Sequence, residues 1–108
     1  MLGTHSTAPT LDELHTLRPK IMALAVKHGV RSLMVIGSVA RGQARDDSDV
    51  DFLVEFDPEH IPGLIGLAEM EIELSELVGR NADLRTAGDL SRYLREDIVK
   101  NAVVQYAA

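Results

Sequence analysis

The chain has 108 residues, a formal net charge of −6 and 45% hydrophobic residues, which is the size and composition of a single folded domain over residues 1–108. The absence of cysteine excludes disulfides, thiolate catalysis and Cys-ligated zinc, and the four histidines are not spaced as metal ligands. The acidic balance weighs against nucleic-acid binding, and no apolar run or leader indicates a membrane protein or a secreted one, so we expect a cytoplasmic protein.

The first element predicted along the chain is an amphipathic helix. Residues 1–9 carry no pattern and are expected to form a flexible end. Thr10 and Glu13 have the spacing of a capping box, and the apolar residues that follow recur at three- and four-residue steps. Pro19 interrupts this pattern, so either the helix kinks there or its main part begins near Arg18 with Pro19 in the first turn.

The remaining elements alternate between strands and helices. Short apolar or alternating runs predict the strands, and four-residue periodicity predicts the helices. Their order is strand 31–36, short helix 38–44, strand 49–56, helix 63–78, strand 81–86 and helix 90–102. We therefore predict an α/β fold, a small mixed sheet of at least three strands packed with helices. Only about a dozen residues connect the first two strands, near the lower limit for a parallel crossover, so antiparallel pairing there stays open.

Two aspartates, Asp49 and Asp51, fall on one face of the strand 49–56, because successive side chains of a strand point to opposite faces. Carboxylates about 7 Å apart along a strand repel each other unless a cation lies between them. Magnesium, which prefers oxygen ligands and often also binds substrate phosphates, suits such a pair. A third acid, Asp83, lies between Ala and Leu in the strand 81–86, where an aspartate is unexpected without a partner.

The pair Gly37-Ser38 follows an apolar strand and begins a helical turn. Free backbone N–H groups and a hydroxyl at such a position can bind an anion, although this signal is weak by itself. Ten residues separate the pair from Asp49, which starts the next predicted strand. Because neighbouring strands lie about 4.8 Å apart, the anion site and the carboxylates should meet. Together they supply the positioning and charge neutralisation that phosphoryl-type transfer needs.

Four other charged features have a simpler interpretation. His28 ends a helix, where the dipole favours a cation, and Asp47 lies in a polar turn. The acidic run 69–76 is interpreted as a solvated helix face. Arg85, two residues after Asp83, could contact a phosphate or an acceptor, but an ion-paired strand residue is the interpretation we favour.

The segment GSVARGQARDDSDVDFLVEF resembles the signature of the nucleotidyltransferase superfamily that includes DNA polymerase β. It resembles more closely the minimal nucleotidyltransferases (MNT), the antitoxin partners of HEPN-domain toxins. With the later segments ADLRT and LSRYLREDIVKNAV, the resemblance covers roughly residues 20–106. It implies a polymerase β-like core with phosphate-binding Gly37 and Ser38, a nearby Arg41, and the magnesium-binding and catalytic residues Asp49, Asp51 and Asp83.

The resemblance also implies an activity and a partner. Members of the family transfer AMP from ATP to a tyrosine of the partner HEPN toxin, with magnesium, expected as two ions, and the modification silences the toxin's RNase. Two alternatives are an antitoxin that acts by binding and occlusion alone, and a nucleotidyltransferase for a small molecule. The intact carboxylate set favours the enzyme over occlusion. Small-molecule enzymes of the aminoglycoside type usually carry a second domain for the acceptor, which this sequence does not show.

Overall fold

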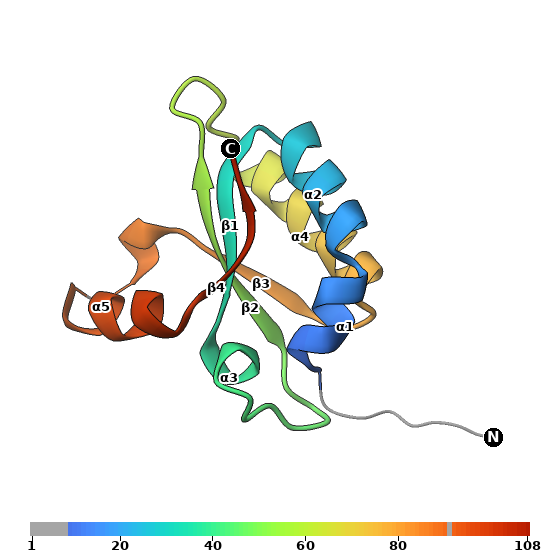
Figure 1. Cartoon of the computed structure of the whole chain (residues 1–108). Helices are drawn as coiled ribbons and strands as arrows, with labels where there is room; N and C mark the ends of the chain where they lie inside the picture. Colours follow the sequence, from blue (N-terminus) through green and yellow to red (C-terminus); the bar gives the residue numbers. More distant parts are fainter. Residues whose placement is uncertain (1–8, 91) are drawn as a thin grey trace.

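The computed structural model describes the backbone of residues 9–90 and 92–108, and their side chains except those of 92–95 (Figure 1). The flexible end expected over residues 1–9 therefore lies outside the description, apart from Pro9. For that residue the prediction was wrong, because Pro9 is buried. It lines a small cavity together with Val39 and Ala44, which belong to the segment that follows the first strand.

The N-terminal helical region consists of two helices, α1 (Leu11–Thr16) and α2 (Arg18–Lys27). The Thr10 side chain accepts a hydrogen bond of 3.2 Å from the backbone N–H of Glu13, as the capping pattern predicts. Pro19 lies in the first turn of α2, where a backbone N–H has no partner within the helix. The second of the two alternatives at Pro19 is therefore the observed one.

The predicted mixed sheet is confirmed and has four strands, β1 (Val30–Ile36), β2 (Val50–Phe56), β3 (Ala82–Arg85) and β4 (Val103–Ala107). Their order across the sheet is β3-β2-β1-β4. Strand β1 pairs antiparallel with β2 and with β4, whereas β2 and β3 are parallel. The short connection after β1 therefore joins two antiparallel strands, β1 and β2, which is one of the pairings that the sequence left open. The remaining elements are α3 (Gly37–Ala40), α4 (Leu64–Val78), the 3-10 turn η1 (Ala87–Asp89) and α5 (Arg92–Asn101).

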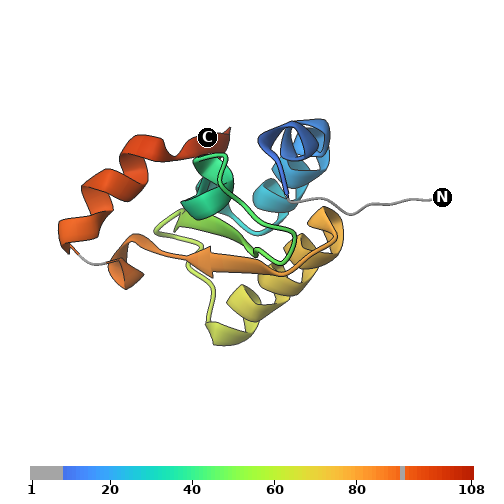
Figure 2. The ribbon, with the colours of Figure 1, turned by 90° about the horizontal axis from the view of Figure 1, so that it is seen from below.

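One face of the sheet carries the core. Helices α1, α2 and α4 lie together on this side, whereas α5 projects from the other side (Figures 1 and 2). Phe52 and Val54 of β2 are buried in a cluster with Ile21 of α2 and with Met70 and Leu74 of α4. Each such side chain contributes roughly 1.5–3 kcal/mol when fully buried. Because strand residues alternate, this packing turns the odd-numbered residues of β2 to the opposite face.

The last helix predicted over 90–102 is confirmed as α5, and it is followed by a strand, β4, that was not predicted. Helix α5 ends at Asn101, and Val103 and Val104 pair with β1 as the start of β4. The Arg18 side chain donates hydrogen bonds to the Val104 carbonyl at 2.7 Å and to the Gln105 carbonyl at 3.4 Å. Two β-branched residues next to an open sheet edge favour a strand after the helix ends. Across the described residues, no helix is long and apolar enough to cross a bilayer.

Candidate functional site

Strand pairing brings two of the predicted aspartates together. Asp51 of β2 is the register partner of Asp83 in parallel β3 and of Ile36 in β1. Both carboxylates therefore emerge on the sheet face away from the core, and both are half-buried. Asp49 is exposed and lies one residue before β2, not within the strand as expected. The two paired aspartates form the centre of the candidate site, and the charge of the exposed Asp49 acts on Asp51.

The charges at this centre repel one another. Burial raises the pKa of Asp51, and the nearby carboxylate of Asp83 raises it further. Arg85 acts in the opposite direction, whereas Asp49 and a side-chain hydrogen bond with Asp83 again favour the protonated form. The charges of Asp83 and Asp49 thus both disfavour the ionised form of the half-buried Asp51. Bringing a cation among them would relieve this repulsion.

Gly37 adjoins Asp51 so closely that any larger residue would displace the Asp51 carboxylate. Its φ angle is +74°, in the region that L side chains rarely adopt. A Cβ at this position would lie 2.8 Å from Oδ2 of Asp51, closer than a real Cβ contact permits. Strand β1 ends at Ile36, the register partner of Asp51, so the start of α3 falls beside the carboxylate. The predicted anion-binding turn with Gly37 and the half-buried Ser38 therefore shares one site with the aspartates.

The two arginines near the motif differ in their surroundings. Arg41 caps the C-terminus of α3, is exposed, and donates a hydrogen bond of 3.4 Å to the side chain of Gln43. Within the described residues it forms no ion pair with the aspartates. Arg85 lies on the same sheet face as Asp83, and its Nη2 is 4.0 Å from Oδ2 of that carboxylate. The favoured interpretation of Arg85 as an ion-paired strand residue is thus confirmed.

The donor set suits a divalent metal, although it does not surround one. Across the described part of the chain, no group of three or more His, Cys, Asp or Glu side chains is arranged to enclose an ion. Hard cations such as magnesium nevertheless prefer carboxylate oxygens and often bind only one or two protein carboxylates, with phosphate and water completing the shell. Asp51 and Asp83, facing each other with their mutual repulsion, fit that requirement.

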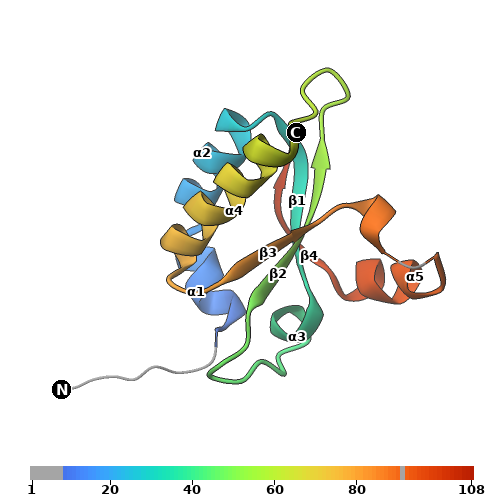
Figure 3. The ribbon, with the colours of Figure 1, turned by 180° about the vertical axis from the view of Figure 1, so that it is seen from behind.

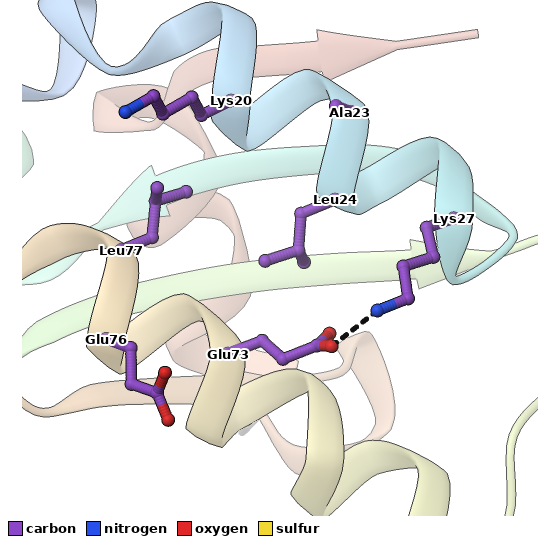
Figure 4. Close-up of a pocket in the computed structure, with 7 residues that line it drawn as sticks. All are labelled: Lys20, Ala23, Leu24, Lys27, Glu73, Glu76 and Leu77. Atoms are coloured by element: carbon purple, nitrogen blue, oxygen red, sulfur yellow. Dashed lines mark hydrogen bonds and ion pairs between the residues drawn. The ribbon is translucent and has the colours of Figure 1, made fainter.

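A second polar feature lies on the other side of the sheet. A groove of about 440 Å³ runs between α2 and α4, and Lys27 Nζ lies 2.6 Å from Oε1 of Glu73 in it (Figure 4). His28 caps α2 and pairs with the other oxygen of the same carboxylate. Hydrogen bonds from Lys27 and His28 lower the pKa of Glu73. His28 is therefore a helix-end residue, as predicted, and the groove contains none of the three aspartates.

Comparison with known proteins identifies the family to which the chain belongs. The model of the nucleotidyltransferase domain family matches residues 20–105. The protein adenylyltransferase MntA of Thermococcus cleftensis is 37% identical over 95 residues, which are 87% of this chain and 94% of that protein.

Solved structures agree with this match and with the predicted polymerase β-like fold. One described as a candidate minimal nucleotidyltransferase has a TM-score of 0.74 and 35% identity, and covers 94% of this chain and 98% of its own. A chain from the complex of tri-AMPylated HEPN toxin with MNT antitoxin of Shewanella oneidensis shares the fold, with a TM-score of 0.65, 16% identity and coverage of 88% and 73%. The chain therefore belongs to the nucleotidyltransferase domain family and is one of its minimal nucleotidyltransferases.

Proposed function

We propose that this protein is an antitoxin that transfers AMP from ATP to a tyrosine hydroxyl of a partner HEPN toxin, and that this modification silences the toxin's RNase. The observation that carries the proposal is the pairing of Asp51 with Asp83, with Gly37 against Asp51. Such a placement has no use in a protein that acts by occlusion alone, because three acids at one point cost stability. The relative named protein adenylyltransferase supports AMP as the transferred group.

In this proposal the start of α3 binds the phosphates of ATP. The backbone N–H groups at the start of α3 bind the phosphates, and the hydroxyl of Ser38 donates a hydrogen bond to them. The missing side chain of Gly37 makes room for the Asp51 carboxylate beside them. Arg41, exposed at the end of the same short helix, supplies positive charge next to them. Asp49, Asp51 and Asp83 would hold magnesium, expected as two ions, which when bound neutralises phosphate charge and orients the α-phosphate.

Asp83 is proposed to act on the acceptor. Its carboxylate takes the proton of the tyrosine hydroxyl, and the freed oxygen forms a bond with the α-phosphorus of ATP. The bond between the α-phosphorus and the bridging oxygen breaks, and pyrophosphate leaves with the electron pair. Arg85 Nη2 lies 4.0 Å from Oδ2 of Asp83 and supplies a positive charge beside this carboxylate. The tyrosine comes from the partner in a heteromeric complex.

The test uses the chain, a HEPN toxin, magnesium and ATP labelled at the α-phosphate. We expect intact-mass spectrometry to find one AMP, or a small multiple, on a tyrosine of the toxin. Asp49→Asn should abolish the labelling without lowering the thermal midpoint, because Asp49 is exposed and makes no core contact. Neutralisation of the toxin without any mass increase would instead establish occlusion. Label recovered on an added aminoglycoside, and not on the toxin, would establish a small-molecule enzyme.

A further inference from the structure

The outer surface of α4 exposes large apolar side chains that the core does not use. The inner side of the helix already packs in the core, where Met70 and Leu74 are fully buried. The exposed fractions are 87% for Leu64, 79% for Ile65 and 59% for Ile72 on α4, and 71% for Ile61 in the loop that leads into the helix. We call these four residues the α4 ridge. Several large exposed apolar side chains gathered on and next to one helix indicate an interaction site more strongly than a single exposed side chain does.

A row of unpaired carboxylates runs beside the ridge. Glu69 and Glu76 are seven residues apart, as are Ile65 and Ile72, so the two pairs form parallel rows along the helix. Both glutamates are exposed, and neither has an ion pair among the described residues. Figure 4 shows Glu76 without a dashed line, next to Glu73, which pairs with Lys27. The acidic row beside the ridge is therefore available to an outside partner.

The other two glutamates of α4 are occupied. Glu71 accepts a hydrogen bond of 2.9 Å from the backbone N–H of Leu84 at the outer edge of β3. Glu73 accepts hydrogen bonds from Lys27 and from His28. Glu73 pairs at the surface, in agreement with the interpretation of this run as a solvated helix face, whereas Glu71 is half-buried and departs from it. Only Glu69 and Glu76, which flank the ridge, are both exposed and without an ion pair among the described residues.

The ridge continues into an apolar cavity. Ile61 lines a space of about 280 Å³ together with Val54 and Phe56 from the end of β2 and with Ala87 of η1. A cavity of this size accepts one large apolar side chain, which is the usual form of an anchor at the centre of a protein interface. Ridge, acidic row and cavity together have the anatomy of a docking surface with an apolar centre and a charged rim.

We propose that the α4 ridge docks a protein partner whose own apolar ridge is flanked by Lys and Arg and inserts one large apolar side chain beside Ile61. A second copy of this chain does not meet that description. Helix α4 has no basic residue, and the chain has a net charge of −6, so two copies would bring acidic rows together. A basic partner gains ion pairs with Glu69 and Glu76 and associates faster. The inference rests on the proposed function in taking the HEPN toxin as this partner.

The position of the ridge is compatible with catalysis. Helix α4 belongs to the helical layer, on the sheet face away from Asp51 and Asp83 (Figure 3). A toxin subunit held on α4 therefore leaves the carboxylates accessible to ATP, and the acceptor tyrosine reaches them from a toxin subunit of the heteromeric complex that lies over the opposite sheet face. Substitutions at the carboxylates should therefore remove AMP transfer without removing docking on α4.

The test compares two double variants of the purified chain for binding to the HEPN toxin by isothermal titration calorimetry. I65S/I72S removes two ridge side chains, and M22S/V26S removes two exposed apolar side chains of α2 as a matched control, where Met22 is 41% and Val26 is 61% exposed. We expect I65S/I72S to weaken binding at least about tenfold and the control to change it about twofold or less. E69K/E76K should also weaken binding, and should reduce its sensitivity to salt.

Thermal melts and ATP titrations should be the same for all variants, which separates docking from folding and from the nucleotide site. Binding of I65S/I72S with wild-type affinity would overturn the proposal. So would a dimer of the wild-type chain alone, seen by analytical ultracentrifugation and abolished by I65S/I72S, because the occupant would then be a second copy. If the wild type binds through the ridge but the toxin gains no AMP, the proposed transfer fails and the docking surface stands. If the wild type does not bind the toxin, both fail.

Discussion

Gly37→Ala is the substitution that tests the geometry of the site most sharply. The new methyl group would meet two obstacles, the φ angle of +74° and the Asp51 carboxylate at 2.8 Å. Gly42 offers a matched control, because its φ angle is +70° and no atom lies within 4 Å of its added Cβ. Both alanine variants share the backbone strain, and only Gly37→Ala disturbs Asp51.

The expected magnitudes follow from these two terms. A left-handed conformation costs an alanine about 1–2 kcal/mol. Alanine also restricts the unfolded chain more than glycine does, which stabilises the folded state by about 0.4–1 kcal/mol. The net loss of about 1 kcal/mol should lower the thermal midpoint of each variant by roughly 4–8 °C in a domain of this size. In Gly37→Ala the carboxylate must also move away from the methyl group. A displacement of about 1 Å in a catalytic group can cost on the order of a hundredfold in rate.

The assay is the initial rate of AMP transfer to the toxin, measured at a temperature where both variants are folded, together with a thermal melt of each. We expect Gly42→Ala to transfer AMP at close to the wild-type rate and Gly37→Ala to be at least about a hundredfold slower. If Gly37→Ala were as active as Gly42→Ala, the closeness of Gly37 to Asp51 would have no role in catalysis. The proposed site would then be wrong.

Three further substitutions have predictable outcomes. Asp51→Asn should raise the thermal midpoint in the absence of nucleotide and metal, because it removes the repulsion with Asp83. It should also abolish AMP transfer. A thermal midpoint below that of the wild type would contradict the repulsion argument. Gln105→Leu should stabilise the fold by about 1 kcal/mol in a urea titration, because Oε1 of this buried residue has no partner. Glu73→Gln should make the free energy of unfolding less sensitive to a fall in pH. The pKa of Glu73 is lower in the folded than in the unfolded chain, so its ionised form adds stability above the unfolded pKa near 4.5, and this stability is lost as the pH falls through the folded pKa. If the thermal midpoints of the wild type and of Glu73→Gln fell equally over that pH range, the prediction would be contradicted.

The sequence allowed the centre of the site to be predicted because it depends on alternation. Once Phe52 and Val54 face a core, Asp51 must face away from it, and the same holds for Asp83 beside Leu84. The expectation that neighbouring strands bring the motifs together was also sound, because β2 pairs with both β1 and β3. These inferences use only local periodicity and strand adjacency, which a single sequence carries.

What the sequence did not reveal depends on contacts between distant parts of the chain. Strand β4 exists because Val103 and Val104 pair with β1, about 70 residues earlier, and no local pattern after the last helix indicates that pairing. Pro9 is buried by residues beyond β1 for the same kind of reason. The reason that Gly37 must be glycine is equally non-local, since the obstacle is the Asp51 side chain on the next strand.

The measurement that tests the central claim most directly is the intact mass of the HEPN toxin after incubation with ATP, magnesium and either the wild-type chain or Asp83→Asn. We predict that the wild type adds AMP to a toxin tyrosine. We also predict that Asp83→Asn, although folded and still bound to the toxin, leaves its mass unchanged. Transfer by Asp83→Asn at the wild-type rate would contradict the assignment of the paired carboxylates as the catalytic centre.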